Sequence, residues 1–342
     1  MKKVLLILAL ALTTSMTFAQ DTPLEISGSG DLYYKYDLSK NPNIGTSFAT
    51  DQNSVSLGMI DIALKKKTGK TSFVGEVSFG PRGAGQSIPD VGGQSFHIQN
   101  LYASYAASEK LTLTAGYMAT FVGYEVISPL GNLNYSTSYL FTNGPFQNAG
   151  FKANYAISSK VGLMVGAFND QWNVYQANSS FGLNAFGAQL SLSPVKGLTA
   201  YINYLDGSAS GTVVDLTAAY QISEKFKLGL NVADFSGTID DTGYTGFAVY
   251  PSYAVSSNFS LALRAENFKA KKAGSPFGPS FSNVIADESV TALTLSANLK
   301  SGGLTFIPEF RMDSGSANMF LDSDLAATKS ASQVSLAVVY GF

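Results

Sequence analysis

The sequence predicts an all-β fold, a closed antiparallel β-barrel of about 16 strands, from three observations. The last segment, 332–342, alternates between larger apolar residues and small or polar ones, and it ends on Phe342. The same two-residue period, which is that of a β-strand, recurs along most of the chain. The connections between these periodic segments alternate between tight and long. Together these features are typical of a barrel that crosses the outer membrane of a bacterium.

The periodic segments are bounded by turn signals and number sixteen. In chain order they are 24–37, 54–66, 70–80, 96–107, 110–123, 147–157, 160–169, 182–193, 197–206, 212–222, 225–236, 244–255, 258–268, 289–300, 303–313 and 332–342. Alternation is clearest in the fifth segment, where Leu111 and Leu113 oppose Thr112 and Thr114. We expect one set to face lipid and the other to face the interior.

Seven connections are tight and eight are generally longer, and the two kinds alternate strictly. The longer ones are 38–53, 81–95, 124–146, 170–181, 207–211, 237–243, 269–288 and 314–331. This order places the tight turns and both termini on the periplasmic side and the long loops outside the cell. A count of 14 or 18 strands stays open, because the connections 81–95 and 124–146 are long enough to hide or absorb a strand.

The first residues are typical of a secretion signal. The basic pair Lys2 and Lys3 precedes an unbroken apolar run of nine residues, and the small-residue pattern before Gln20 fits a cleavage site. A run of nine is too short for a membrane-spanning helix, which needs about 20 residues. We therefore predict a cleavable signal peptide over 1–19, and a single barrel domain over 20–342 in the outer membrane.

Composition agrees with a membrane barrel in contact with outer-membrane lipids. Charged residues make up 13% of the chain, against about 25% in soluble domains. Cysteine is absent, so disulfides and thiolate metal sites are excluded, and no motif indicates a cofactor. Removing Lys2 and Lys3 takes the formal net charge from −2 to −4, which gives no reason to expect nucleic-acid binding.

Alternation places a set of charged side chains on the inward face, where we expect them to line the pore. These are Asp31, Lys35, Asp61, Glu76, Lys152, Asp215, Lys227, Arg264, Glu266, Glu309 and Arg311. In a water-filled lumen such charges bias ion passage. The alternative is that they only solvate the lumen and pair with one another. The strongest candidates are four residues that two late strands contribute: Arg264, Glu266, Glu309 and Arg311.

One segment carries a family resemblance. From Asn134 to Phe146 the chain reads Asn-Tyr-Ser-Thr-Ser-Tyr-Leu-Phe-Thr-Asn-Gly-Pro-Phe, and a Gly-Phe-Lys strand segment follows at Gly150. This resembles the OmpL-like β-barrel porins over about forty residues, although the Gln147-Asn148 pair departs from the family pattern. The resemblance implies an outer-membrane porin for passive diffusion of small hydrophilic solutes or ions. It also allows a homo-oligomer, for which the sequence shows no contiguous interface.

The resemblance further suggests that the third long connection, 124–146, folds into the lumen and narrows it. Polar and aromatic residues alternate there, and a loop this long is uncommon unless it is functional. Its candidate constriction residues are Asn132, Asn134, Tyr135, Ser138 and Tyr139. The alternative is a surface loop packed over its neighbours.

An enzyme is not expected. The single histidine, His97, has Ser95 two residues away, but no lipase-like motif surrounds either residue. The alternative function is a non-conducting barrel that binds a ligand or acts as a structural or surface-interaction protein through loops 269–288 and 314–331. A transporter of hydrophobic solutes is a weaker alternative, because the inward positions are mostly polar. The resemblance makes Phe342 an assembly signal for the barrel insertion machinery.

Overall fold

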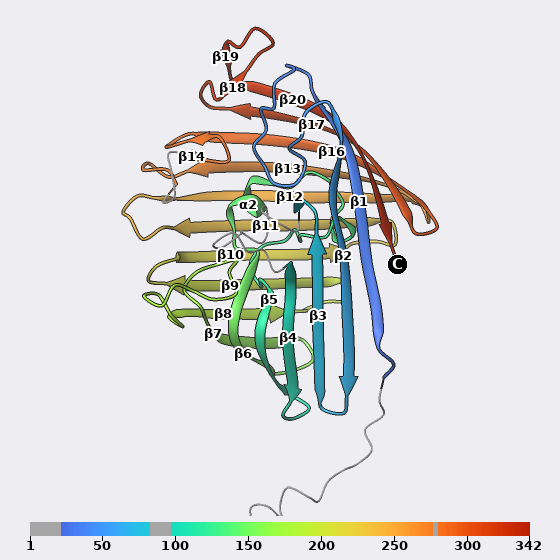
Figure 1. Ribbon diagram of the computed structural model, residues 1–342, viewed down its shortest axis with the longest axis vertical. Helices are drawn as coiled ribbons and strands as arrows, with labels where there is room; N and C mark the ends of the chain where they lie inside the picture. The colour runs from blue at the N-terminus through green and yellow to red at the C-terminus, as the bar shows by residue number, and fades with distance from the viewer. Residues whose placement is uncertain (1–21, 83–96, 276–279) are drawn as a thin grey trace, which may run out of the picture.

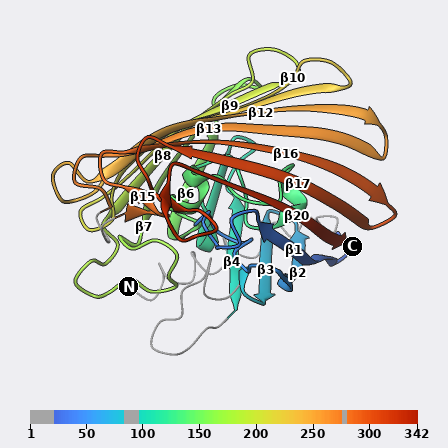
Figure 2. The ribbon, with the colours of Figure 1, turned by 90° about the horizontal axis from the view of Figure 1, so that it is seen from above.

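The chain forms a closed barrel of sixteen antiparallel strands in a computed structural model that describes residues 22–82, 97–275 and 280–342 (Figures 1 and 2). Each barrel strand pairs with the next one along the chain, and β1 pairs with β20 to close the sheet. The predicted fold and strand count are confirmed. The predicted signal peptide, 1–19, and most of the connection 81–95 lie outside the described residues.

Every barrel strand coincides with a predicted segment to within a few residues. The strands are β1 Glu25–Asp37, β2 Ser54–Thr68, β3 Thr71–Phe79, β4 Ile98–Ala106, β5 Leu111–Ala119, β6 Gln147–Ala156, β7 Val161–Phe168, β8 Ala185–Leu192, β9 Leu198–Gly207, β10 Gly211–Gln221, β11 Phe226–Ser236, β12 Gly243–Ser256, β13 Phe259–Ala270, β16 Ser289–Ser301, β17 Leu304–Gly315 and β20 Ser330–Gly341. The tight and long connections alternate as expected.

Short elements inside the long connections were not predicted. Two small hairpins form there, β14 (Ser280–Phe281) with β15 (Val284–Ile285) and β18 (Phe320–Leu321) with β19 (Ala327–Thr328). The connection between β5 and β6 holds a 3-10 turn, η2 (Pro129–Gly131), and a five-residue helix, α2 (Tyr139–Asn143). Within the described ranges, no helix has the length and apolar character to cross a membrane.

Alternation separates the two faces of the wall. On β16, Leu293 and Leu295 are exposed on the outside, whereas Thr294 and Ser296 are buried inside. A membrane-spanning sheet must pair every backbone N–H and C=O, because lipid offers no hydrogen-bond partner, and closure achieves this. Because the backbone is already paired, the outward apolar side chains can face lipid without leaving a polar group unsatisfied.

The first and last strands meet at a closely packed seam, with the C-terminus beside β1 (Figure 1). The backbones of Gly28 and Phe342 exchange two hydrogen bonds of 3.1 Å. A Cβ atom on Gly28 would lie 2.7 Å from the ring of Phe342, so glycine is needed for the ring to cover this position. The terminal residue therefore completes the closure of the sheet.

The barrel interior is packed unevenly. The strands from β10 to β20 contribute inward apolar side chains that form one cluster with the connection between β5 and β6; they include Val213, Phe235, Tyr244, Phe268 and Val290. Tyr139 and Leu140 of that connection lie in the same cluster. The shorter strands β3 to β8 have fewer residues in it. The apolar packing inside the barrel is therefore concentrated beside β10 to β20.

Candidate functional site

The connection between β5 and β6, residues 120–146, is named the inner loop here because much of it is buried inside the barrel. Figure 1 shows its helix α2 near the middle of the barrel. Tyr135 and Tyr139 are 1% and 0% exposed, respectively. Their hydrogen bonds reach across the interior to β1, β13 and β17. The inner loop is therefore docked in the lumen and is not a surface loop.

A carboxylate on β17 holds the middle of the inner loop. The two oxygens of Glu309 accept hydrogen bonds from the backbone N–H groups of Tyr135, at 2.7 Å, and Ser136, at 3.1 Å. Beside it, the amide of Asn134 donates to Ser296 Oγ at 2.7 Å. Charge-assisted hydrogen bonds are about twice as strong as neutral ones. The loop backbone is thus fixed at a defined distance from the wall.

A second carboxylate, on β13, receives the first turn of α2. The oxygens of Glu266 accept from the N–H groups of Tyr139, at 3.0 Å, and Leu140, at 2.9 Å. The preceding residue, Ser138, caps the helix by accepting from the N–H of Phe141 at 3.0 Å. The first-turn N–H groups of a helix have no partner within it, so these contacts satisfy them.

Two arginines hold the loop carbonyls. Arg264 pairs with Glu125 at 2.7 Å and donates to the carbonyl oxygen of Ser136 at 2.6 Å. Arg311 pairs with Asp313 at 2.8 Å and donates to the carbonyl oxygen of Thr137 at 2.8 Å. Both arginines are fully buried. We name β13, β16 and β17, with these anchoring side chains, the anchored wall.

The four strongest predicted pore residues therefore contact the inner loop. Arg264, Glu266, Glu309 and Arg311 face inward as alternation predicted, and each is at most 5% exposed beneath the loop. Sequence reasoning missed Glu125, the partner of Arg264, because it lies in a connection without periodicity. The pore-lining role of these four residues stays a prediction.

Another buried ion pair joins β1 to the connection after β3. Arg82 lies 3.1 Å from Asp31, and its guanidinium sits over the rings of Phe48 and Tyr135 at 4.5 and 4.9 Å. The hydroxyl of Tyr135 donates to Asp31 at 2.6 Å. Arg82 was not predicted, since no pattern in its connection indicates which side chain turns inward.

The connection between β1 and β2 also enters the lumen, which the sequence did not reveal. Phe48 is 1% exposed and its ring lies 5.6 Å from that of Phe141. The N–H of Ser47 donates to Thr142 Oγ1 at 2.9 Å, and Arg311 reaches Thr46 at 2.8 Å. The inner loop is thus clamped between this connection and the anchored wall.

The other predicted inward charges lie on other strands, and one of them, Asp215, also bonds the inner loop. On β3, Glu76 accepts from the amide of Asn100 at 2.6 Å. On β10, Asp215 accepts from Asn203 at 2.5 Å and from the N–H of Gly123 at 3.1 Å. Of the remaining charges, Asp61 accepts a hydrogen bond from Ser29, and Lys35 pairs with Asp37 at 3.1 Å. Lys152 and Lys227 form no ion pair with a described residue.

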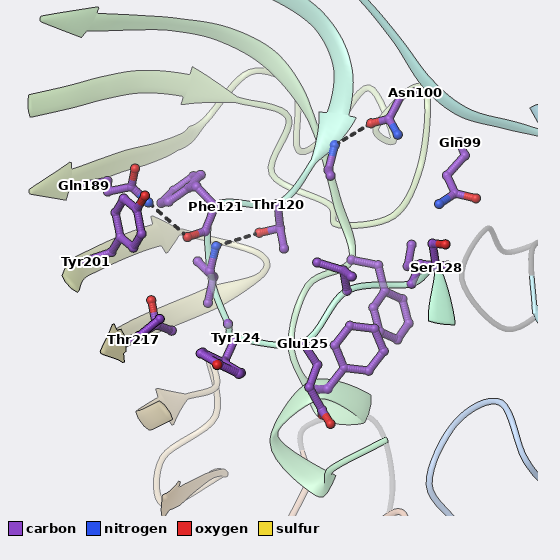
Figure 3. A pocket seen from close by; sticks show the side chains of 18 of the residues that line it. Gln99, Asn100, Thr120, Phe121, Tyr124, Glu125, Ser128, Gln189, Tyr201 and Thr217 are labelled. Carbon is purple, nitrogen blue, oxygen red and sulfur yellow. Dashed lines mark hydrogen bonds between the residues drawn. The ribbon is translucent and has the colours of Figure 1, made fainter. Parts of the chain in front are cut away.

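A cavity of about 450 Å³ lies between the inner loop and the strands opposite the anchored wall; we name it the luminal pocket (Figure 3). Strand residues from β3, β4 and β8 to β10 line it, and we name these strands the open wall. The polar lining includes Glu76, Gln99, Asn100, Gln189, Thr199 and Thr217. Residues 119–128 of the loop and its approach form the facing side.

A second cavity, of about 210 Å³, adjoins the luminal pocket on the far side of Tyr124. Lys227 and Asn132 line it, and Tyr124 and Glu125 line both cavities. The ring of Tyr124 stacks on Tyr250 at 4.4 Å. Tyr124 therefore separates two spaces in the lumen.

The predicted loop residues divide between two positions. Asn134, Tyr135, Ser138 and Tyr139 are buried against the anchored wall or within the loop. Asn132 instead bonds the backbone of Val126 on its own loop, at 2.6 and 3.0 Å, and lines the second cavity. Their role in constriction stays a prediction. Ser95, the neighbour of the single histidine, lies outside the described residues.

Comparison with solved structures finds outer-membrane barrels. The anion-selective porin from Comamonas acidovorans is 13% identical and matches 94% of this chain and 100% of its own, with a TM-score of 0.61. A trimer form of OmpT, an outer membrane protein of Vibrio cholerae, is 10% identical over 94% and 99% of the two chains, with a TM-score of 0.57. A mutant of the Rh. blastica porin is 15% identical over 94% and 100%, with a TM-score of 0.56. At these identities the likeness establishes the fold alone.

Family assignment comes from the sequence. Comparison with curated proteins gave no match. The match to a porin family covers residues 23–342, which is the whole barrel. The chain therefore belongs to the family described as "Putative beta-barrel porin-2, OmpL-like", and it is a porin of the outer membrane.

Proposed function

We propose that small hydrophilic solutes or ions cross the membrane by passive diffusion along the open wall, through the luminal pocket and past residues 120–128. The observation that carries this proposal is the position of the luminal pocket, on the side of the inner loop that faces away from the anchored wall. Arg264, Glu266, Glu309 and Arg311 hold the loop against the anchored wall, and the larger cavity lies on the opposite side. In this reading those four residues set the width of the pore and do not contact the solute.

The polar lining of the open wall supports a hydrophilic solute. Gln189 and Thr199 contribute amide and hydroxyl groups to the pocket, and Tyr201 is 36% exposed there. A barrel of sixteen strands is wide enough for an aqueous channel, whereas eight strands fill their interior with side chains. The function needs no cofactor and no catalytic step.

Single-channel conductance in planar bilayers tests the path. Thr199 and Ala200 are neighbours on β9 that face the pocket and the lipid, respectively, so they form a matched pair. Thr199→Trp should lower the conductance because the indole enters the path, and Ala200→Trp should leave it unchanged. Equal effects of the two variants would refute the path. A folded protein without stepwise openings would instead support the non-conducting barrel.

We also infer that the chain is exported by its signal peptide, is inserted by the barrel machinery and assembles as a homo-oligomer. OmpT has a trimer form with the same fold. The outer face of β3–β7 is hollowed at Ala103, Ala115 and Ala153, which suits close packing of a second copy. Ala115→Trp should shift the detergent-solubilised protein to a smaller mass in light scattering, whereas Leu295→Trp on the far wall should not.

A further inference from the structure

The luminal pocket contains carboxylates and no positive charge. Among its described lining residues, Glu76 and Glu125 are acidic, and none is Lys, Arg or His. Glu125 is neutralised by Arg264, at 2.7 Å. Glu76 bonds only the neutral amide of Asn100 among the described residues, at 2.6 Å. Glu76 is therefore the carboxylate of the pocket that forms no ion pair with a described residue.

A second feature of the pocket is a buried acceptor without a donor. Gln99 is 4% exposed, and its Oε1 has no hydrogen-bond partner among the residues that the structure describes. Its side chain extends into the pocket beside Asn100 (Figure 3). The backbone carbonyl of Gln99 is already occupied by Gln147, at 2.8 Å. This oxygen has almost no accessible surface, so a ligand in the pocket does not reach it in this conformation.

The remaining lining is aromatic. Phe121, Phe141, Phe146, Tyr124 and Tyr201 all line the pocket. Aromatic faces attract cations as well as apolar groups. A volume of about 450 Å³ lies in the usual range for small-molecule sites, about 300–1,000 Å³. The lining thus offers a carboxylate and aromatic rings within one cavity.

Building on the proposed function, we propose that the luminal pocket is a binding site for small primary ammonium compounds with an apolar body, which it retains during passage. The ammonium group pairs with Glu76, and the apolar body lies against the aromatic rings. Such a solute enters more readily than an anion of the same size.

Binding is tested by isothermal titration calorimetry on the folded, detergent-solubilised protein, with phenethylamine as the probe. Phenethyl alcohol and phenylacetate keep the ring and replace the ammonium by a neutral and a negative group. Phenethylamine should bind and the other two should not. The same amine should reduce potassium chloride conductance in planar bilayers in a concentration-dependent way.

The matched variants are Glu76→Gln and Glu109→Gln, which remove the same charge from the pocket and from the periplasmic turn after β4. Glu76→Gln should weaken phenethylamine binding about tenfold, which converts to about 1.4 kcal/mol, and Glu109→Gln should not change it. Equal affinity in the two variants, or equal binding of the alcohol, would overturn the proposal. Calorimetry does not depend on conductance, so binding without channel openings would contradict only the proposed function.

Discussion

The two sides of the barrel interior use their polar groups in opposite ways. On the anchored wall, charged side chains are buried, paired and bound to the backbone of the inner loop. On the open wall, Asp215 also bonds the loop backbone, at Gly123, but most polar side chains line a cavity. Glu76 there has only an amide partner among the described residues. The same alternation pattern produced both sets. An inward charge therefore indicates a position in the lumen. Whether it anchors a loop or lines a cavity depends on whether a loop packs over it.

The largest expected effect comes from breaking the anchored wall. Arg264→Met leaves Glu125 buried without its cation, and the loss of one partner of a buried pair costs about 3–5 kcal/mol. The free energy of unfolding from lipid vesicles in urea, followed by the fluorescence of Trp172, measures this loss. Glu76→Gln on the open wall, which can still accept a hydrogen bond from Asn100, should change stability by less than about 1 kcal/mol. Similar losses in both variants would remove the distinction between the two walls.

Removal of Phe342 should have the next largest effect, on assembly. We expect its deletion to lower outer-membrane yield sharply, because the residue closes the seam with Gly28 and its ring faces lipid. Exposing a phenylalanine to water costs roughly 1.5–3 kcal/mol. Conductance per inserted molecule should stay near normal, since the side chain points away from the lumen. Immunoblots of membrane fractions measure the yield, with Phe342→Tyr as the control; an unchanged yield of the deletion would contradict the assembly role.

A smaller effect is expected at Tyr124, which contacts β11 and β12 between the two walls. A Cβ atom on Gly229 would lie 2.2 Å from the Tyr124 hydroxyl, so Gly229→Ala should displace the ring from Tyr250. Overpacking of this kind costs about 1–3 kcal/mol. The displaced ring should also change the single-channel conductance, because Tyr124 separates the two cavities.

A double-mutant cycle isolates this clash. In a Tyr124→Ala background the substitution of Gly229 should cost little, since the ring that it meets is gone. If the cost is the same in both backgrounds, the position of Tyr124 does not depend on Gly229.

The smallest effect concerns a loop contact outside both walls. Asp170 accepts hydrogen bonds from the N–H of Ala209 at 2.8 Å and from the hydroxyls of Ser208 and Ser210 at 2.9 and 2.6 Å. Burial raises the pKa of Asp170, but the hydrogen bonds led by that from Ser210 outweigh it and hold the pKa below its usual value. The ionised form is therefore favoured in the folded state.

This contribution depends on pH in a defined direction. Because the folded pKa is depressed, the stabilisation is complete above the unfolded value of about 3.9 and is lost as pH falls through the folded pKa. Asp170→Asn should therefore be less stable than the parent at pH 7 by on the order of 1 kcal/mol, with the difference shrinking below about pH 4. Urea titrations at both pH values measure it. A difference that grows on acidification would show the sign to be wrong.

The sequence predicted the barrel strands well and the arrangement of the loops inside the barrel poorly, for a physical reason. Strand positions such as Glu309 repeat every two residues, so the face of each side chain can be read from its neighbours. Phe48, Arg82 and Glu125 lie in connections without a period, and their inward position depends on contacts with distant strands. Helix α2 has five residues, too few for a helical period to show. The loop resemblance indicated the inner loop but gave no information on which wall holds it.

The anchors of the inner loop also affect the order in which the parts of the barrel fold. Tyr135 and its acceptor Glu309 are 174 residues apart in the chain, and Leu140 and Glu266 are 126 apart. The loop belongs to a hairpin of the first half, yet its docking groups are contributed by strands near the C-terminus. Contacts this distant along the chain form late, because loop closure comes first. The width of the channel is therefore fixed only when the last strands join the sheet.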